Sequence, residues 1–177
     1  PPNLVLGHPI AGSHNSGVDA SDGDLYRDHR VILTPLPETD TQALAVVRQM
    51  WLSTGANVAE MEVAEHDAVL AATSHLPHML AYALVDALAS SAITDDIFAF
   101  AAGGFRDFLR IASSDPVMWR DIALSNRNSL LQAIDMYTEN LAQLRESIAS
   151  ADSEALLDTF SRSKAVRDAF VTGNSTS

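Results

Sequence analysis

The pattern of apolar and polar positions changes character near residue 62. Before that point, three short apolar runs, each typical of a β-strand, cover residues 4–6, 31–34 and 57–61. The first run is expected to end at Gly7, and residues 11–30, rich in Gly, Ser, Asp and Asn, to form a loop. Apolar residues at helical spacing predict one helix before the third run, capped by Thr39 or Asp40 and ended by Gly55. Three strands and one helix do not complete a sheet domain, so this part resembles the end of a larger α/β domain.

After residue 62 the apolar spacing is that of helices. The predicted helices cover residues 63–74, 77–90, 97–101, 105–112, 116–148 and 152–170. Ser114, Asp115 and Pro116 form a strong start signal for the long fifth helix, because proline suits the first helical position. The fold class is therefore mostly α, with an all-helical domain over 63–171 after the α/β part at 1–62, and a polar, flexible tail at 172–177. A helix this long needs another surface to cover it, which favours self-association.

Composition excludes several classes of protein. The 177 residues carry 11 basic and 23 acidic side chains, a formal charge of −12, which disfavours nucleic acid and anionic membranes as partners. There is no cysteine, so disulfides and thiolate sites are excluded, which suits a cytoplasmic protein. No secretory signal is recognised, and no transmembrane span is expected, because His75, Pro77, His78 and Asp86 interrupt the most apolar region.

Histidines form the first group of candidate functional residues. His8 follows the first predicted strand between two glycines, a position where α/β sheets place ligands, although the residues alone favour a loop histidine without a role. His75 and His78 lie three apart on one helical face, and His66 or Asp67 would add a third zinc ligand. Histidines near a helix start also satisfy backbone groups, so we expect no metal.

Arginines form the second group. Ten of the eleven basic residues are arginine, and Arg106 and Arg110 share a helical face just after the pair Gly103 and Gly104. Arginine binds carboxylates in a bidentate way, and free N–H groups at a helix start attract anions, so a carboxylate site is one interpretation. Salt bridges to neighbouring aspartates are the other. Trp119 belongs either to the core or to the wall of such a site.

The clusters, taken in order, resemble the prephenate dehydrogenase family, which includes the arogenate dehydrogenases. The matching strings are GHPIAGS at 7–13, VILTP at 31–35, HD at 66–67, ATSHLPH at 72–78, GGFRDF at 103–108, RIASSDP at 110–116 and MWRD at 118–121. Each string alone is weakly specific, but together and in register they are highly specific.

The resemblance implies an oxidative decarboxylation in tyrosine biosynthesis. Prephenate gives up hydride to NAD or NADP and loses CO2, which yields 4-hydroxyphenylpyruvate; arogenate would give tyrosine directly. By this similarity His8 is the catalytic base and Arg110 clamps the ring carboxylate. The other substrate-binding residues would be Ser74, His78, Gly103, Arg106 and Trp119. A homodimer through the helical domain, and L-tyrosine as an inhibitor, also follow from the resemblance.

The chain departs from the family in one respect. The family has a Rossmann-like nucleotide-binding domain with a GxGxxG fingerprint before the GHPIAGS string, and none of the eight glycines here has that spacing. The cofactor-binding residues are therefore unknown, and we expect a fragment that keeps residues 1–62 of that domain and shows little turnover. The alternatives are an arogenate dehydrogenase, a non-catalytic helical dimerisation module, and a metal-dependent hydrolase using His66, His75 and His78.

Overall fold

The computed structural model describes residues 1–12 and 21–174 of the chain, which folds as two compact units, residues 1–130 and 131–177. The strands are β1 (Gly7–Ile10), β2 (Arg30–Leu33) and β3 (Asn57–Glu60). The helices are α1 (Thr41–Ser53), α2 (Val63–Leu70), α3 (Leu76–Ala89), α4 (Thr94–Ala99), α5 (Gly103–Leu109), α6 (Pro116–Ser125), α7 (Arg127–Ala149) and α8 (Ser153–Asn174), with a π-helical turn η2 (Ala71–His75) and a 3-10 turn η3 (Arg110–Ser113). The predicted fold class, mostly α after a small α/β part, is confirmed.

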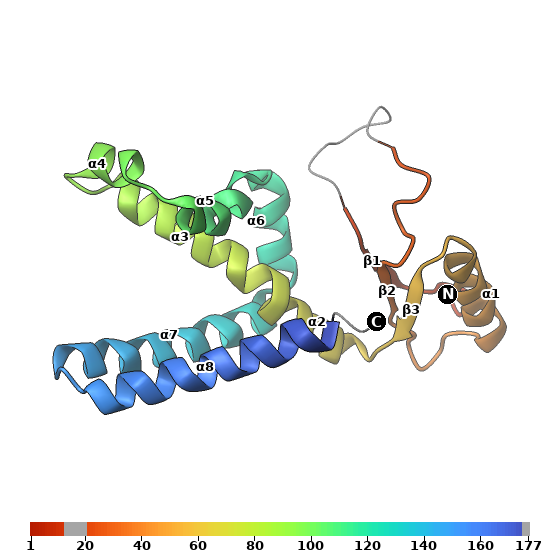
Figure 1. Ribbon diagram of the computed structural model, residues 1–177. Helices are drawn as coiled ribbons and strands as arrows, with labels where there is room; N and C mark the ends of the chain where they lie inside the picture. The colour runs from red at the N-terminus through yellow and green to blue at the C-terminus, as the bar shows by residue number, and fades with distance from the viewer. Residues whose placement is uncertain (13–20, 175–177) are drawn as a thin grey trace. The chain divides into compact units, whose positions relative to one another are not determined.

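The small sheet has the order β1-β2-β3, with β1 antiparallel and β3 parallel to the central strand (Figure 1). Val31 and Leu33 of β2 are fully buried against α1, whose Leu44, Val47 and Trp51 pack on them as the apolar stripe predicts. The carboxylate of Asp40 accepts a hydrogen bond from the backbone N–H of Ala43 at 2.8 Å, the N-cap expected from the sequence. The core of this part is thus built around one buried strand.

The first strand begins where the sequence analysis expected it to end. β1 starts at Gly7, and His8 lies within it, paired with Ile32 of β2. A Cβ atom on Gly7 would lie 2.9 Å from a methyl group of the buried Leu33, so a larger residue at this position would require the Leu33 side chain to shift. Pro9 lacks an N–H donor and is tolerated because β1 is an edge strand among the described residues. The predicted loop at 11–30 includes residues 13–20, which lie outside the described residues, as does Ser13 of the GHPIAGS string.

The predicted break between residues 74 and 77 is wrong. Residues 63–89 form one continuous helix, α2-η2-α3, in which the turn Ala71–His75 is widened to π geometry. A proline ring in an α-helix clashes with the carbonyl four residues before it, and the wider turn immediately before Pro77 relieves that clash. The helix therefore passes through the proline, with its irregular turn beside the histidines.

The predicted helix over 116–148 is also wrong as a single helix. It is interrupted at Asn126, between α6 and α7, where the backbone leaves helical geometry with φ −104° and ψ 36°. The apolar spacing did not reveal this break, because Asn126 falls on the same helical face as Ile122 and Leu130. The α6 start is as predicted, with Asp115 accepting from the N–H of Met118 at 2.7 Å and Pro116 first in the helix.

Helices α4, α5 and η3 all contact α3, and Tyr82 of α3 donates its hydroxyl to the carbonyl of Ser114 at 2.7 Å. In the second unit α7 and α8 run in opposite directions (Figure 1). The last helix extends to Asn174, beyond the expected end at Phe170, and residues 175–177 of the predicted tail lie outside the described residues.

Among the described residues, the helix over Val63–Ala89 is long and apolar enough, by length and composition alone, to cross a membrane. It meets that criterion despite the polar residues that led the sequence analysis to expect no span. Core helices of soluble proteins pass the same test, so one such helix is weak evidence for a membrane protein.

Candidate active site

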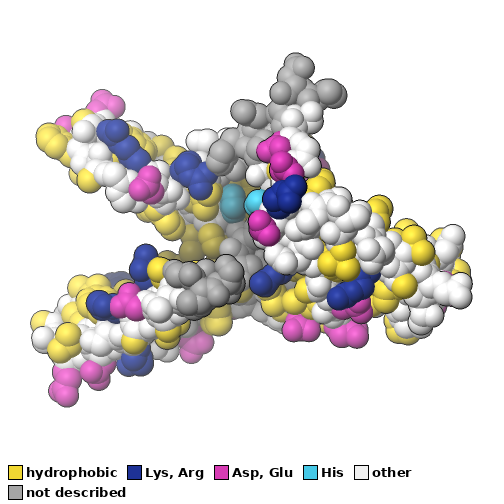
Figure 2. Space-filling view, turned by 45° about the vertical axis from the view of Figure 1, so that its right-hand side comes forward, with side chains coloured by type: hydrophobic (Ala, Val, Ile, Leu, Met, Phe, Trp, Pro, Cys, Tyr) yellow, Lys and Arg dark blue, Asp and Glu magenta, His cyan; other side chains and the backbone are white. Residues whose placement is uncertain are grey.

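The histidines singled out in the sequence meet at one pocket, which we call the histidine pocket. It has a volume of about 440 Å³ and lies wholly within the first unit. Its lining residues come from β1, α2, η2, α6 and the α6–α7 junction: His8, His66, Asp67, His75, Met118, Asp121, Ile122, Ser125 and Asn126. In Figure 2, histidine side chains reach the surface beside both acidic and basic side chains. Segments more than a hundred residues apart in the sequence thus form one polar cavity.

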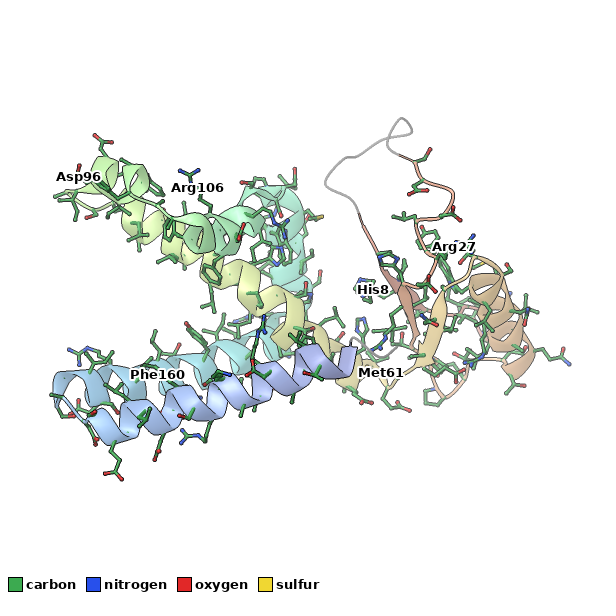
Figure 3. The ribbon with its side chains drawn as sticks, viewed as in Figure 1. His8, Arg27, Met61, Asp96, Arg106 and Phe160 are labelled. Carbon is green, nitrogen blue, oxygen red and sulfur yellow. The ribbon has the colours of Figure 1, made fainter. Side chains whose placement is uncertain are left out.

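His8 is held in this pocket by a neighbouring histidine and, through it, by an aspartate. Its Nδ1 lies 3.0 Å from Nε2 of His66, and the Nδ1 of His66 lies 2.9 Å from a carboxylate oxygen of Asp67. The two imidazole rings are 5.2 Å apart between centroids and tilted by 59°. Figure 3 shows His8 on β1, beside the start of the helical part. The three side chains form a continuous chain of hydrogen bonds.

Asn126 links α2, the π-helical turn and the start of α7. Its side-chain amide donates to the backbone carbonyl of Asp67 at 2.8 Å and lies 3.2 Å from Nδ1 of His75. An amide nitrogen only donates, so the Nδ1 of His75 is the acceptor and its proton resides on Nε2. The break in the long helix therefore has a structural reason, because leaving helical geometry lets Asn126 make these contacts.

His78 and Trp119 form a stacked pair on α3 and α6. Their rings lie 3.6 Å apart at an interplanar angle of 20°, and His75 meets the same indole edge-on at 6.1 Å. The Nδ1 of His78 donates to the carbonyl of Ser74 at 2.8 Å, across one turn of the helix. Trp119 is 6% exposed, and its indole N–H has no hydrogen-bond partner among the described residues. The structure thus brings Ser74, His78 and Trp119 together next to the histidine pocket.

The predicted carboxylate clamp lies elsewhere on the first unit. Gly103, Arg106 and Arg110 are exposed on α5 and η3, and none of them lines the histidine pocket. Arg106 projects outward from α5 (Figure 3). Helix α5 and the turn η3 both pack against α3, the helix that carries His78. The histidine and arginine clusters therefore occupy neighbouring but separate parts of this structure.

The electrostatics of the pocket favour the neutral form of two of its histidines, His8 and His75. Burial, followed by the neighbouring His66, lowers the pKa of His8 below its usual 6.5. Burial also lowers the pKa of His75, and its neighbours His8, His66 and His78 lower it further, while Asp67 opposes them. A histidine that stays neutral near pH 7 has a lone pair to accept a proton, which is what a general base requires.

Among the described residues, no group of three or more His, Asp or Glu side chains is arranged to hold a metal ion. The trio of His66, His75 and His78 considered in the sequence is not assembled around one point: His66 binds His8 and Asp67, and His78 binds a backbone carbonyl. The described hydrogen bonds of these histidines are therefore made to other protein groups.

Sequence reasoning missed five pocket residues, namely Met118, Asp121, Ile122, Ser125 and Asn126. Met118 and Asp121 lie within the MWRD string, which had drawn attention to Trp119. The polar Asn126 on an otherwise apolar helical face was the available signal for the rest, because a buried amide on such a face needs a partner.

Two family models match consecutive parts of the chain, which together cover most of its length. Residues 2–60 match the prephenate dehydrogenase nucleotide-binding domain, and residues 62–162 match the prephenate dehydrogenase dimerization domain. The chain belongs to the prephenate dehydrogenase family. Both halves of the resemblance drawn from the sequence strings are thereby confirmed.

Individual members of the prephenate dehydrogenase family agree with this assignment. A cyclohexadienyl dehydrogenase from Zymomonas mobilis is 41% identical over 171 residues, which is 96% of this chain. The crystal structure of prephenate dehydrogenase from Aquifex aeolicus, in complex with hydroxyphenyl propionate and NAD+, is 42% identical with a TM-score of 0.88 over 94% of this chain. Synechocystis arogenate dehydrogenase is 29% identical with a TM-score of 0.85 over 95% of this chain. The chain spans 58%, 58% and 62% of the lengths of these three proteins, respectively.

Proposed function

We propose that the protein catalyses the oxidative decarboxylation of prephenate to 4-hydroxyphenylpyruvate, with NAD+ or NADP+ as hydride acceptor. The observation that supports this most is the histidine pocket, in which a neutral histidine is held by its neighbours at the strand that carries the family's GHPIAGS string. The related Aquifex aeolicus protein was crystallised with hydroxyphenyl propionate, an aromatic acid, and with NAD+. The product of the proposed reaction, 4-hydroxyphenylpyruvate, is likewise an aromatic acid, and the proposed hydride acceptor is a cofactor of the same kind.

His8 is the catalytic base in this proposal. As hydride leaves the ring carbon of prephenate, the hydroxyl on that carbon gives its proton to His8, and the C–O single bond becomes a carbonyl. The bond to the ring carboxylate then breaks, its electron pair makes the ring aromatic, and the proton returns from His8 to the phenol oxygen. Atoms and charges balance, with CO2 and the reduced cofactor as the other products.

Six further side chains and backbone positions would bind the substrate, and they divide into two sets. Ser74, His78 and Trp119 lie beside the histidine pocket and suit the pyruvyl side chain and the flat ring. Gly103, Arg106 and Arg110 present N–H donors and positive charge from α5 and η3, and Arg110 is the proposed clamp for the ring carboxylate. The second set must approach the pocket when substrate binds, because it does not line the pocket here.

The cofactor, when bound, supplies the hydride acceptor. The described residues fit its reactive end better than its phosphates: His8 is exposed on β1, whereas the N-terminus of α1 already holds the carboxylate of Asp40, whose charge would repel a pyrophosphate. This chain's own residues therefore bind and orient the substrate and take up its proton.

Arogenate dehydrogenase is the second candidate activity, because the Synechocystis arogenate dehydrogenase shares this fold over nearly the whole chain. Arogenate and prephenate differ at the side chain, where one has an amino group and the other a keto group. Both reactions use the same ring chemistry, so His8 and Arg110 would have the same roles in each.

An assay of NAD+ and NADP+ reduction, with prephenate and arogenate offered separately, tests the proposal. Reduction with prephenate supports the first activity, and reduction with arogenate alone supports the second. No reduction in any of the four pairings, by folded protein, contradicts both. The same assay with L-tyrosine added tests the inhibition that the family resemblance implies. A soluble, acidic biosynthetic enzyme of this kind would act in the cytoplasm.

The second unit supports a homodimer. Both of its helices expose large apolar side chains, including Leu131, Met136, Leu141 and Ile148 on α7 and Leu157, Phe160, Val166 and Phe170 on α8. Apolar faces of this extent need a partner, and a second copy of the dimerization domain supplies one.

Sedimentation at micromolar concentration checks the homodimer, with Phe160→Glu expected to give monomers. Ser161→Glu, the adjacent exposed position on the same helix, is the matched control and should leave the dimer intact. A wild-type protein that sediments as a strict monomer would contradict this part of the proposal.

A further inference from the structure

The hydrogen bond of His8 continues through two further side chains of the pocket lining. His8 on β1 contacts His66 in the first turn of α2, and His66 contacts Asp67, the next residue of the same helix. The side chain of His66 is 18% exposed and that of Asp67 is 41% exposed, so the inner histidine is shielded while the carboxylate keeps access to water. A carboxylate in water remains charged at neutral pH at low cost.

The direction of each hydrogen bond follows from the chemistry of the end group. An ionised carboxylate only accepts, so the Nδ1 of His66 carries a proton and donates it to Asp67. The Nε2 of a neutral His66 then has a lone pair and accepts from Nδ1 of His8. His8 in turn keeps its own lone pair on Nε2. The arrangement thus leaves Nε2 as the basic nitrogen of His8.

We propose that His66 and Asp67 are positioning residues for His8, which hold its ring in the tautomer with a basic Nε2 and stabilise its charge once it has taken up a proton. This inference rests on the proposed function, in which His8 is the base. The same logic operates wherever a carboxylate orients a histidine through the nitrogen that does not react. Here the imidazole of His66 lies between the carboxylate of Asp67 and the ring of His8, so the carboxylate acts on His8 from a greater distance.

Other charged and titratable groups line the histidine pocket or lie beside it. His75 lies on the π-helical turn, His78 on α3 and Asp121 on α6, and Asp67 is the acidic residue bonded to the chain of histidines. Burial lowers the pKa of His8, and the neighbouring His66 lowers it further by repelling a second positive charge. Asp67 counters this repulsion, so its removal should make His8 a weaker base.

The backbone around Asp67 is held independently of its side chain. Its carbonyl accepts from Asn126 at the α6–α7 junction, and its position in α2 is fixed by the helix. An Asp67→Asn variant therefore removes the charge while leaving the surrounding contacts in place. A His66→Gln variant offers His8 an acceptor oxygen in place of the imidazole nitrogen. A His66→Leu variant has a similar volume and offers no acceptor.

The test that needs no turnover is the tautomeric state of His8, measured by long-range ¹H–¹⁵N correlation spectra on this chain. In the wild type we expect the proton on Nδ1 of His8. In His66→Leu we expect the proton to move to Nε2, the tautomer that unconstrained histidine side chains prefer, and in His66→Gln to remain on Nδ1. His29→Gln is the matched control, because His29 is an exposed histidine whose Nδ1 lies 3.0 Å from the carbonyl of Arg27 and which does not line the histidine pocket. The proposal is overturned if His8 of the wild type is protonated on Nε2. It is also overturned if His66→Leu leaves the tautomer of His8 unchanged.

The second test is kinetic and uses enzyme that turns over prephenate or arogenate. His66→Leu should lower kcat by about 10- to 100-fold, a part of what a general base contributes, while KM stays within about twofold. His66→Gln should recover most of that loss, and Asp67→Asn should move the acidic limb of the kcat profile to lower pH. An equal loss in His66→Leu and His66→Gln would indicate a merely structural role and contradict the proposal.

The two measurements separate the two ideas. A His8 protonated on Nδ1 in a folded protein without dehydrogenase activity would support the hydrogen-bonded arrangement and contradict the proposed function. An active enzyme whose His8 carries its proton on Nε2 would support the function and overturn the positioning role.

Discussion

The histidine pocket and the arginine segment, residues 103–113, are held in different ways. In the pocket, His66, His75 and Asn126 are half-buried and each makes a side-chain hydrogen bond to another part of the fold. In the arginine segment, Arg106 and Arg110 are exposed on a seven-residue helix followed by a single 3-10 turn. The base of the proposed reaction thus lies in the pocket before substrate arrives, whereas the proposed clamp does not line that pocket.

The physical reason lies in the local structure of each region. Helix α5 begins at a glycine pair without a side-chain cap, and so short a helix depends on packing rather than on its own propensity. Phe100, shortly before the helix, and Phe108, within it, are 85% and 45% exposed. A segment with few buried contacts adapts at low cost, which suits residues that must close on a dianion. The comparison therefore predicts different kinetic signatures for the two regions.

His8→Ala gives the largest expected effect. Without the base, kcat should fall by about 100- to 10,000-fold, with little change in the affinity for the cofactor. Steady-state kinetics with saturating cofactor measures this, and His29→Ala is the control because it removes a histidine far from the pocket lining. Full turnover by His8→Ala would show that His8 is not the base. The proposed difference in role between the histidine pocket and the arginine segment would then be wrong.

Arg110→Ala should act on binding instead. Losing a charged hydrogen bond to the ring carboxylate should raise KM by about 10- to 100-fold with a smaller change in kcat. Arg145→Ala, an exposed arginine of α7, is the matched control. A loss confined to kcat would show instead that Arg110 acts in the chemical step, as the histidine does.

Asn126→Ala tests whether the pocket is held as firmly as its hydrogen bonds indicate. The change leaves Nδ1 of His75 and the carbonyl of Asp67 without this donor, which should lower the free energy of unfolding by about 1–3 kcal/mol. Urea denaturation measures the loss, and Asn128→Ala, exposed two residues later, should cost far less. Equal stability of the two variants would mean that the pocket is no better fixed than the arginine segment.

The sequence predicted the elements that depend on local signals. The cap at Asp40, the start at Pro116 and the buried strand around Val31 all follow from residues within a few positions of one another. It failed where a tertiary contact decides. Gly7 was expected to end a strand, but it begins β1, where it pairs with Leu33 of β2.

The same holds for the site. His8 and Trp119 were identified from strings of neighbouring residues, whereas the importance of Asn126 depends on two partners more than fifty positions away. Because the apolar spacing continues across Asn126, the sequence predicted one helix where the structure has two. The π-helical turn before Pro77 was likewise invisible, because a proline in the first turn of a new helix and a proline after a widened turn have the same sequence pattern.

Acid stability gives the smallest of the expected effects, and its sign follows from the pocket. The folded-state pKa values of His8 and His75 lie below 6.5, so between those values and 6.5 the unfolded chain binds more protons than the folded chain. Stability from these two groups is therefore complete above pH 6.5, falls as the pH drops below it, and levels off once the folded-state pKa values are passed. Arginine side chains stay charged throughout this range, so the arginine segment contributes no such slope.

The free energy of unfolding, measured by urea denaturation at pH 5.5 and pH 7.5, should therefore differ less in His8→Gln than in the wild type. The variant removes one group that resists protonation, and it also removes a repulsive neighbour of His75, so both changes act in the same direction. Arg106→Gln should leave the difference unchanged. If both variants reduced it equally, the pocket would not be the source of the acid sensitivity. If neither did, His8 would lie in a more open environment than its hydrogen bond to His66 indicates, and the contrast between a preformed base and an adaptable clamp would disappear.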